Sequence, residues 1–373
     1  MTRYTLTAAA ALLASTSIAS AGGIDRAAPS TSILFEEGTY VEIGYSFADP
    51  EISGAVNGAP LNSGDIGASF SSVSVRYRQD LTDELSFALI FDQPYGASVD
   101  YPTGTGYPFA GSTAEITSQQ LTGVLRYQIN ENVSVYGGLR ALRATGDAYV
   151  SAGTAFTYYL DSESEWALGY MVGAAYEMPE IALRVALTYY SGIDLTLEGV
   201  ETPGAAGTPE AGLAAAAPAT SFEVNMPQQV HLEAQSGIAE DTLLFGSVRW
   251  TDYGGFAITP NRYPTPSGNL VDYDDDVFTF ALGVGRRIND EFSVSGTVGY
   301  ETERGGFSGN LGPTDGVFSL GLGGEYTMGQ ISLAGGIQYS WIGNADTQLG
   351  GGATSTFSDN SALGVGLRVG YSF

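Results

Sequence analysis

The sequence predicts an all-β protein, a transmembrane antiparallel β-barrel of about fourteen strands with a short N-terminal hatch segment. Residues 362–373 alternate without a fault between apolar side chains and small or polar ones, which indicates a strand with two different faces. Short polar turns alternate with long loops along the chain. After Ala21 no uninterrupted apolar segment approaches the ~20 residues that a spanning helix needs. Only a closed barrel of such strands could then cross a bilayer.

The first residues have the pattern of a secretion signal. Residues 1–21 contain Arg3, an Ala- and Leu-rich run, and small residues at the end, so we expect cleavage after Ala21. The alternative, a membrane anchor, would need a longer apolar run. Residues 22–38 have no steady period and hold Pro29, so they are predicted to form a periplasmic or hatch segment before a barrel at 39–373.

Two kinds of connection divide the barrel region into strands. Six short turns and seven long loops join fourteen strands, which is the pattern of an outer-membrane barrel with both ends on the periplasmic side. The short turns are expected at 80–83, 130–132, 178–180, 239–241, 289–291 and 328–330. The long loops are expected at 49–64, 100–112, 146–165, 199–221, 253–272, 305–316 and 343–360.

Charged side chains within the predicted strands fall on one face. An arginine facing lipid near the midplane costs roughly 2–4 kcal/mol, so this face is assigned to the lumen. The arginines predicted to line the lumen include Arg76, Arg126, Arg140, Arg184, Arg249 and Arg368.

The composition excludes several classes of partner. The formal net charge is −27, and it becomes −28 once the signal peptide with Arg3 is removed, so no nucleic-acid partner is expected. The chain has no cysteine and therefore no disulfides. With 23 tyrosines, 17 phenylalanines and only 15% charged residues, it fits a surface surrounded by outer-membrane lipid and lipopolysaccharide. The terminal Phe373 resembles the signal that the barrel assembly machinery recognises.

We expect neither an enzyme nor a cofactor or metal site. The one histidine, His231, is predicted to face the lumen beside Glu233, and no Ser-His-acid set is visible. The acidic run 272–276 lacks the spacing of a calcium loop and is read as a solvated rim. Glycine-rich runs such as 321–324 are followed by no helix that could bind phosphate.

Several short sequence markers, taken in their order along the chain, resemble those of the FadL-type family of outer-membrane long-chain fatty-acid and hydrocarbon transporters. The similarity covers nearly the whole mature chain. The markers are Gly22–Arg26, Leu34–Gly38, Pro94–Gly96, Met226–Pro227, Leu244–Trp250, Gly312–Gly316 and Asp359–Phe373.

The resemblance implies passive uptake of long-chain fatty acids or similar hydrophobic small molecules. It implies ligand capture between the third and fourth long loops, so that Phe156, Tyr158, Tyr159, Leu160 and Leu213 would bind ligand, with Ile24 of the hatch reaching it. It also implies lateral release through a gap at a kinked third strand, here at Pro94, Tyr95 and Gly96. The residue types predict the same kink without the resemblance, because proline cannot donate a hydrogen bond to the ladder and glycine weakens a strand.

Other interpretations stay open at this stage. Pro94 could mark an ordinary strand end, and the loop aromatics could be interfacial girdle residues. The N-terminal segment is shorter than in the best-known members and lacks their asparagine-proline-alanine turn, so its role as a plug is undecided. The alternative functions are a general anion-preferring porin and a structural or adhesive barrel.

Overall fold

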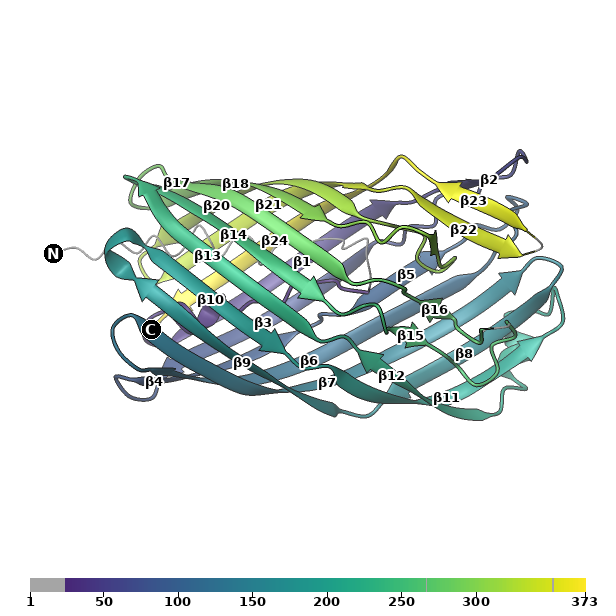
Figure 1. Cartoon of the computed structure of the whole chain (residues 1–373), viewed down its shortest axis with the longest axis horizontal. Helices are drawn as coiled ribbons and strands as arrows, with labels where there is room; N and C mark the ends of the chain where they lie inside the picture. Colours follow the sequence, from purple (N-terminus) through teal and green to yellow (C-terminus); the bar gives the residue numbers. More distant parts are fainter. Residues whose placement is uncertain (1–23, 266, 351) are drawn as a thin grey trace.

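The structure, a computed structural model, describes residues 24–265, 267–350 and 352–373. The predicted signal peptide, residues 1–21, lies outside the described residues, as do Gly22 and Gly23. In the described part of the chain, fourteen antiparallel strands form one closed barrel, which confirms the predicted fold class (Figure 1).

Ten of the fourteen wall strands in the described residues are single segments: β1 (Tyr40–Glu51), β3 (Phe70–Asp80), β6 (Thr113–Gln128), β7 (Val133–Ala152), β14 (Thr242–Thr251), β17 (Val277–Arg287), β18 (Phe292–Glu301), β20 (Val317–Met328), β21 (Ile331–Ile342) and β24 (Asn360–Ser372).

The other four wall strands are each broken into two segments. They are the third strand, β4 (Leu85–Asp92) and β5 (Gly96–Asp100); the sixth, β8 (Phe156–Ser164) and β9 (Ala167–Met178); the seventh, β10 (Leu183–Tyr190) and β11 (Ile193–Gly204); and the eighth, β12 (Ala219–Met226) and β13 (Gln229–Ala239).

Short elements lie outside the wall. They are the strands β2 (Gly54–Val56), β15 (Ala257–Ile258), β16 (Val271–Asp272), β19 (Phe307–Ser308), β22 (Ala345–Gly350) and β23 (Ala353–Phe357), the 3₁₀ turns η2 (Ser32–Phe35) and η3 (Pro179–Ile181), and the helix α2 (Glu210–Ala214). No described helix is long and apolar enough to cross a membrane.

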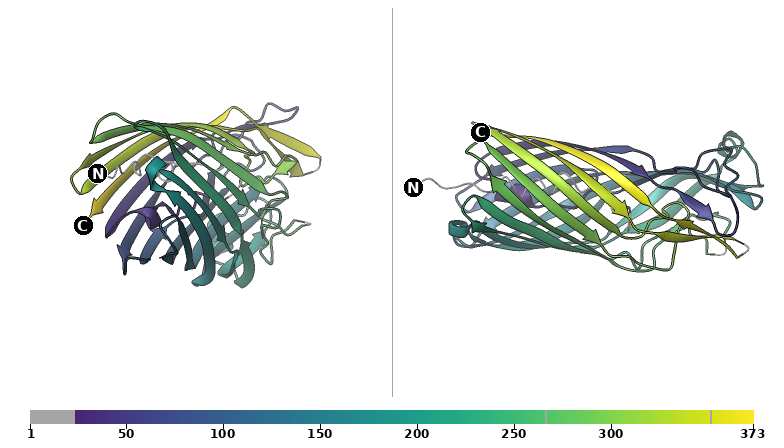
Figure 2. Two further views of the ribbon diagram at one scale, coloured as in Figure 1. Left: turned by 60° about the vertical axis from the view of Figure 1, so that its left-hand side comes forward. Right: turned by 90° about the horizontal axis from the view of Figure 1, so that it is seen from above.

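Pairing of the first and last strands closes the barrel. β1 pairs antiparallel with β24 from Tyr40–Ser372 to Glu51–Ser361, and with β3 on its other side. The six short turns lie at one end with the C-terminus, and the long loops extend from the other end (Figure 2). Each strand of such a wall has its ladder partners on both sides, so the described sheet has no free edge.

The prediction of a long third loop at 146–165 is wrong. β7 runs on to Ala152 and β8 begins at Phe156, so the connection is the turn 153–155. These strands continue beyond the lipid, where the period of two persists and the outer face is polar. Buried inward residues alternate there with exposed outward acids, namely Ala148, Val150, Tyr158 and Leu160 against Asp147, Asp161 and Glu163. The fourth loop, predicted at 199–221, is shortened to 205–218 for the same reason.

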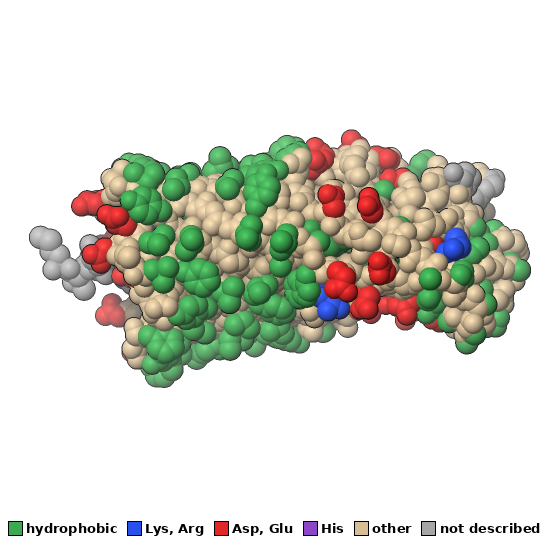
Figure 3. Space-filling model, turned by 90° about the horizontal axis from the view of Figure 1, so that it is seen from below, with side chains coloured by type: hydrophobic (Ala, Val, Ile, Leu, Met, Phe, Trp, Pro, Cys, Tyr) green, Lys and Arg blue, Asp and Glu red, His purple; other side chains and the backbone are tan. Residues whose placement is uncertain are grey.

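A belt of exposed apolar side chains surrounds the half of the barrel nearer the short turns. Leu139, Leu322 and Leu367 are each more than half exposed and alternate with inward neighbours. Figure 3 shows this belt giving way to a zone with acidic side chains toward the loop end. Apolar surface of this extent is expected only against lipid.

The N-terminal segment, residues 24–38, lies inside the barrel. Ile33, Leu34 and Phe35 of η2 are buried and belong to one apolar cluster with Ile90 and Tyr136 of the wall. The lumen of the described barrel is therefore partly filled by the chain itself.

Candidate functional site

Arginines of the wall hold the N-terminal segment in place. Arg126 donates through Nη1 to Leu34 O (3.1 Å), pairs with Glu177, and stacks on the ring of Phe35 (4.6 Å). Arg184 lies 4.4 Å from the centre of the same ring. Charge-assisted hydrogen bonds of this kind are stronger than neutral ones, so the segment is fixed from several sides.

Asp25 and Arg249 form a buried ion pair between this segment and β14. Their side chains are 3% and 4% exposed, and Oδ2 lies 3.0 Å from Nη1. Burial raises the pKa of Asp25, and the guanidinium of Arg249 opposes that rise. In the described residues, Nε and Nη1 of Arg249 have no hydrogen-bond partner, so charge attraction holds this pair together.

The third strand bulges where the sequence predicted a break. Asp92 pairs with Gln120 and Gly96 pairs with Thr117, so four residues of the third strand span three of β6. The extra residue lies at 93–95, around Pro94, which has no N–H to donate. Tyr95 is buried and bonds through its N–H to Ser118 Oγ (2.9 Å).

This bulge opens a ladder gap toward the second strand. Pairing of β3 with β4 stops at Val75–Phe91, and the next bridge is Gly67–Val99. Residues 68–74 and 92–98 do not pair with each other, and we name them the first ladder gap; Val73 N donates across it to Gln93 Oε1 (3.0 Å).

The N-terminal segment covers this gap from the lumen. Arg26 N and Ala27 N donate to Pro94 O, and Gly96 N donates to Ile24 O (2.7 Å). The Arg26 side chain lies against Gly96, where an added Cβ would collide with it, and reaches over the ring of Phe70 (4.4 Å). One side chain thus spans both edges of the first ladder gap.

An apolar cavity of about 60 Å³ lies on the lumen side, at the loop end. Its lining comes mainly from the N-terminal segment, the broken strands, β6, β7 and the loop 252–276, and includes Ile24, Ala97, Leu160, Leu195, Leu197, Phe222, Val224 and Met226. Ala97 belongs to the first ladder gap, so the cavity borders the gap directly.

The structure brings together only some of the predicted ligand residues. Ile24 and Leu160 line the apolar cavity. Phe156 and Tyr158 pack edge-on against Tyr263 of the loop 252–276 (5.8 and 4.9 Å between ring centres). Tyr159, only half-buried, alternates with the buried Tyr158 and Leu160. Leu213 of α2 is buried against Gly204, and neither it nor Tyr159 lines the cavity.

Most of the cavity lining was missed by reasoning from the sequence. Leu195, Leu197, Phe222, Val224 and Met226 alternate with polar residues, as any strand does. A signal was present, because their alternating neighbours are acidic or amide side chains rather than glycine or serine: Asp194, Glu198, Glu223 and Asn225. Acidic side chains cannot face lipid, so in these strands the apolar face must be the inner one.

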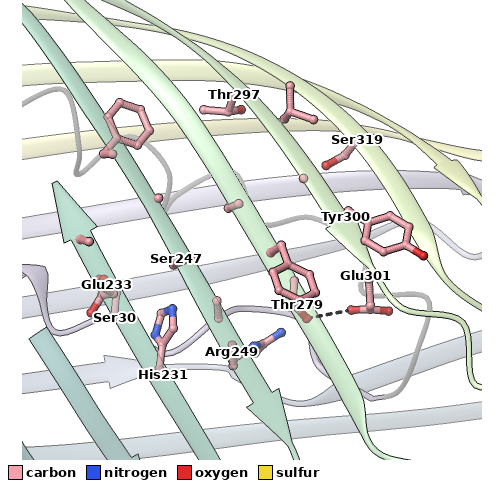
Figure 4. Close-up of a pocket in the computed structure, with 18 of the residues that line it drawn as sticks. Ser30, His231, Glu233, Ser247, Arg249, Thr279, Thr297, Tyr300, Glu301 and Ser319 are labelled. Carbon is pink, nitrogen blue, oxygen red and sulfur yellow. Dashed lines mark hydrogen bonds between the residues drawn. The ribbon is translucent and has the colours of Figure 1, made fainter. Parts of the chain in front are cut away.

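A second cavity of about 150 Å³, lined by both apolar and polar side chains, lies beside residues 28–32 of the N-terminal segment. Figure 4 shows His231, Arg249, Thr279, Thr297 and Glu301 around it, with Thr279 Oγ1 donating to Glu301 (3.3 Å). His231 Nδ1 lies 3.0 Å from Pro29 O, and Thr31 Oγ1 donates to Glu233 (2.9 Å). Charged and hydroxyl groups therefore lie beside apolar side chains in this part of the lumen.

The remaining predicted lumen arginines also lie inside the barrel. Arg76 and Arg368 both approach Glu42 (3.2 and 3.3 Å), and Arg368 approaches Glu325 (3.6 Å). Arg140 donates to Gln120 and to Ser191 O. These cations are paired with the wall, in contrast to the free row of cations that anion conduction would favour.

Comparisons with known proteins agree with this architecture. A family model described as outer membrane protein transport protein (OMPP1/FadL/TodX) matches residues 24–373. No curated protein matches the chain by sequence.

Solved structures of this architecture share the fold at low sequence identity. A Pseudomonas aeruginosa FadL homologue has a TM-score of 0.78 at 17% identity, over 92% of each chain. The toluene transporter TodX of P. putida has 0.67 at 10% identity, over 91% of each chain. The toluene transporter TbuX of Ralstonia pickettii has 0.64 at 14% identity, over 91% of this chain and 90% of that one. The chain therefore belongs to the OMPP1/FadL/TodX family of outer-membrane transport proteins, in the outer membrane of a Gram-negative bacterium.

Proposed function

We propose that this protein takes up long-chain fatty acids or similar hydrophobic molecules passively and releases them sideways into the bilayer at the first ladder gap. The observation that carries the proposal is that one apolar cavity touches both the N-terminal segment, through Ile24, and the first ladder gap, through Ala97. Each methylene buried in such a cavity contributes roughly 0.8 kcal/mol, so alkyl chains and small hydrocarbons fit its chemistry.

Charged groups in the lumen support a lateral exit. A hydrophobic molecule moving straight toward the short turns would meet the Asp25–Arg249 pair and the arginines around η2. Moving sideways past Ala97, it would meet the first ladder gap, which the guanidinium of Arg26 covers. The sideways route therefore avoids the charged groups deeper in the lumen.

Release would require the N-terminal segment to move. Arg26 covers the first ladder gap, and its neighbour Ile24 lines the cavity, so a ligand that pushes on Ile24 would displace the cover at the same time. No bond is made or broken in this scheme. We accordingly propose a transporter without catalytic activity, in which capture at Phe156, Tyr158, Tyr159 and Leu213 would precede entry into the cavity.

Deleting Pro94 tests the exit. The deletion makes the third strand equal in length to its β6 partner, and it restores an unbroken alternation with Asp92, Tyr95 and Ala97 all inward. We expect a continuous ladder and loss of uptake. The measurement is uptake of radiolabelled oleate and of toluene by cells without another transporter for them.

The matched control deletes Gly58, which is exposed in the loop after β2 and where an added Cβ would contact nothing within 4 Å. This variant should take up both probes like the unmodified chain. Equal uptake by the Pro94 deletion, with its folding verified by heat-dependent electrophoretic mobility, would exclude the first ladder gap as the exit. Porin-scale conductance of the unmodified chain in planar bilayers would instead favour the alternative of an anion-preferring porin.

A further inference from the structure

The sixth strand repeats the construction of the third. Leu142 pairs with Ala167 and Thr145 pairs with Glu163, so four residues of the sixth strand span three of β7. The extra residue lies at 164–166, between β8 and β9. As in the third strand, the extra residue reverses the alternation, so even-numbered residues that point inward on one side of the bulge point outward on the other.

This bulge is again accompanied by a ladder gap, here toward the seventh strand. Pairing stops at Tyr190–Met171 and resumes at Leu197–Ser164. We name the residues between, 165–170 and 191–196, the second ladder gap. In the described chain, the hydrogen bonds across this gap join Ser191 and Tyr170, from Ser191 N to Tyr170 O and from Tyr170 N to Ser191 Oγ.

The gap exists because neighbouring strands switch faces at different heights. The sixth strand switches at 165–166 and the seventh at 191–192, so between these points opposite residues point to opposite sides of the wall. Leu168 is 71% exposed, whereas Ile193, which faces it in register, is 2% exposed. The seventh and eighth strands switch at the same height, and their ladder resumes at once from Tyr190–Gln229 to Ile193–Met226.

Ile193 covers the second ladder gap from the lumen. A Cβ added to Gly169 would lie 2.6 Å from Ile193 Cγ1 and 2.9 Å from Ser191 Oγ, so the Ile193 side chain rests where Gly169 has none. The arrangement parallels Arg26 over Gly96 at the first ladder gap. In both places a side chain covers a glycine at the edge of the gap: Arg26 comes from the N-terminal segment, and Ile193 comes from the opposite strand of the gap itself.

The second ladder gap separates lipid from the apolar cavity by one layer of side chains. On the outside, Leu168 and Tyr170 are exposed at the loop-side edge of the apolar belt. On the inside, Leu195 lines the same cavity that Ala97 lines from the first ladder gap. A molecule dissolved in the bilayer could therefore reach this cavity without passing the charged groups deeper in the lumen.

We propose that the second ladder gap is a second lateral passage, with Ile193 as its removable cover. It exchanges hydrophobic molecules of the class taken by the proposed function between the apolar cavity and the loop-side leaflet of the bilayer. The proposal rests on that function for the identity of the molecules, but the passage itself can be tested without transport.

The test uses a reporter cysteine at Leu195, because the natural chain has no cysteine. Leu195→Cys protein in proteoliposomes is labelled with N-dodecylmaleimide, which stays in the bilayer. The comparison is made in the Pro94 deletion, so that entry through the first ladder gap is removed. Ile193→Ala should raise the labelling rate about tenfold, the effect of losing most of the burial of one side chain.

Val150→Ala is the matched control. Val150 is a buried, inward side chain of β7 in the same apolar cluster, but it lies at neither ladder gap and does not line the cavity. It should leave labelling by N-dodecylmaleimide unchanged, and Ile193→Leu, which keeps a cover, should do the same. Equal labelling rates in the Ile193→Ala and Val150→Ala proteins would overturn the passage.

Two further measurements keep the result decisive. If a charged, water-soluble maleimide gains as much from Ile193→Ala as the dodecyl probe does, the route is the lumen and the proposal is wrong. Should Ile193→Ala fail to fold, Gly169→Ala, whose Cβ displaces Ile193, must raise labelling by the dodecyl probe instead. Absence of oleate uptake by the unmodified chain would refute the proposed function alone, since labelling at residue 195 does not depend on transport.

Discussion

At the scale of single residues, Asp25 decides where the N-terminal segment sits. Its carboxylate is paired with Arg249 inside the lumen, next to the residue that covers the first ladder gap. Breaking a buried pair by removing one partner costs about 3–5 kcal/mol, because the other charge is left without compensation. The simplest relief for such a charge is to let the segment undock and admit water.

Asp25→Ala should therefore free the N-terminal segment while the barrel stays folded. We expect faster labelling of an introduced Ala27→Cys by a charged maleimide, with a population shift equivalent to ~3–5 kcal/mol at most. Asp49→Ala, which removes an exposed carboxylate, serves as the control. The double variant Asp25→Ala with Arg249→Met should label slowly again, and fast labelling of that double variant would show that the pair is not the anchor.

At the scale of elements, one loop closes the mouth of the barrel over the predicted capture residues. The loop 252–276 joins β14 to β17 and reaches β8 and β11. The buried carboxylate of Glu201 on β11 accepts from the backbone N–H groups of Asn261 (3.0 Å) and Arg262 (3.1 Å) and from the hydroxyl of Tyr158 (2.6 Å). This carboxylate holds Tyr263 against Phe156 and Tyr158.

Replacing Glu201 should release this loop. Glu201→Ala leaves several buried donors without an acceptor, at about 1–3 kcal/mol for each unsatisfied group. We expect increased cleavage after Arg262 when intact cells are treated with trypsin, measured by mass spectrometry of the fragments. Glu198→Ala removes an exposed, outward carboxylate three residues away on the same strand and should leave cleavage as in the unmodified chain. Equal protection of Arg262 in both variants would contradict this account of the loop.

At the scale of the whole molecule, the barrel has two halves. Nearer the short turns, the outer face is apolar and the lumen holds both the wall arginines and the apolar cluster of η2, whereas nearer the loops the outer face carries acids and the interior is apolar. Many inward side chains from β17 to β24 are small, among them Ala281, Gly283, Thr297, Gly321 and Gly366. The N-terminal segment therefore supplies much of the filling in the half that lies in lipid.

Removing residues 24–38 should turn this closed lumen into a pore. We expect the unmodified protein to show little conductance in planar bilayers and the truncated protein to show steps on the scale of a porin. The physical reason is that the small wall side chains leave room for water once η2 and its neighbours are gone. The Pro94 deletion, with the segment in place, is the control and should stay closed. No conductance in the truncated protein would mean that the wall residues themselves fill the lumen.

The features that could be predicted from the sequence are those that depend on residues close together in the chain. The alternation at 362–373, the six short turns and the inward arginines follow from period two and from the cost of charge in lipid, and these predicted the fourteen-stranded barrel. The break at Pro94 follows from one missing N–H. By contrast, the loop boundaries at 146–165 and 199–221 were wrong, because a polar outer face beyond the lipid was read as loop.

The sequence by itself determined which segments form strands in lipid, because alternation and missing donors are properties of neighbouring residues. Only the tertiary structure decided that Asp25 meets Arg249, that Leu195 and Ala97 share one cavity, and that the sixth and seventh strands lose their ladder. These depend on how the closed sheet sets one strand against the next. A switch of faces in one strand opens a ladder gap only where the neighbouring strand switches at a different height, and the sequence of one strand does not give the height of the switch in the other.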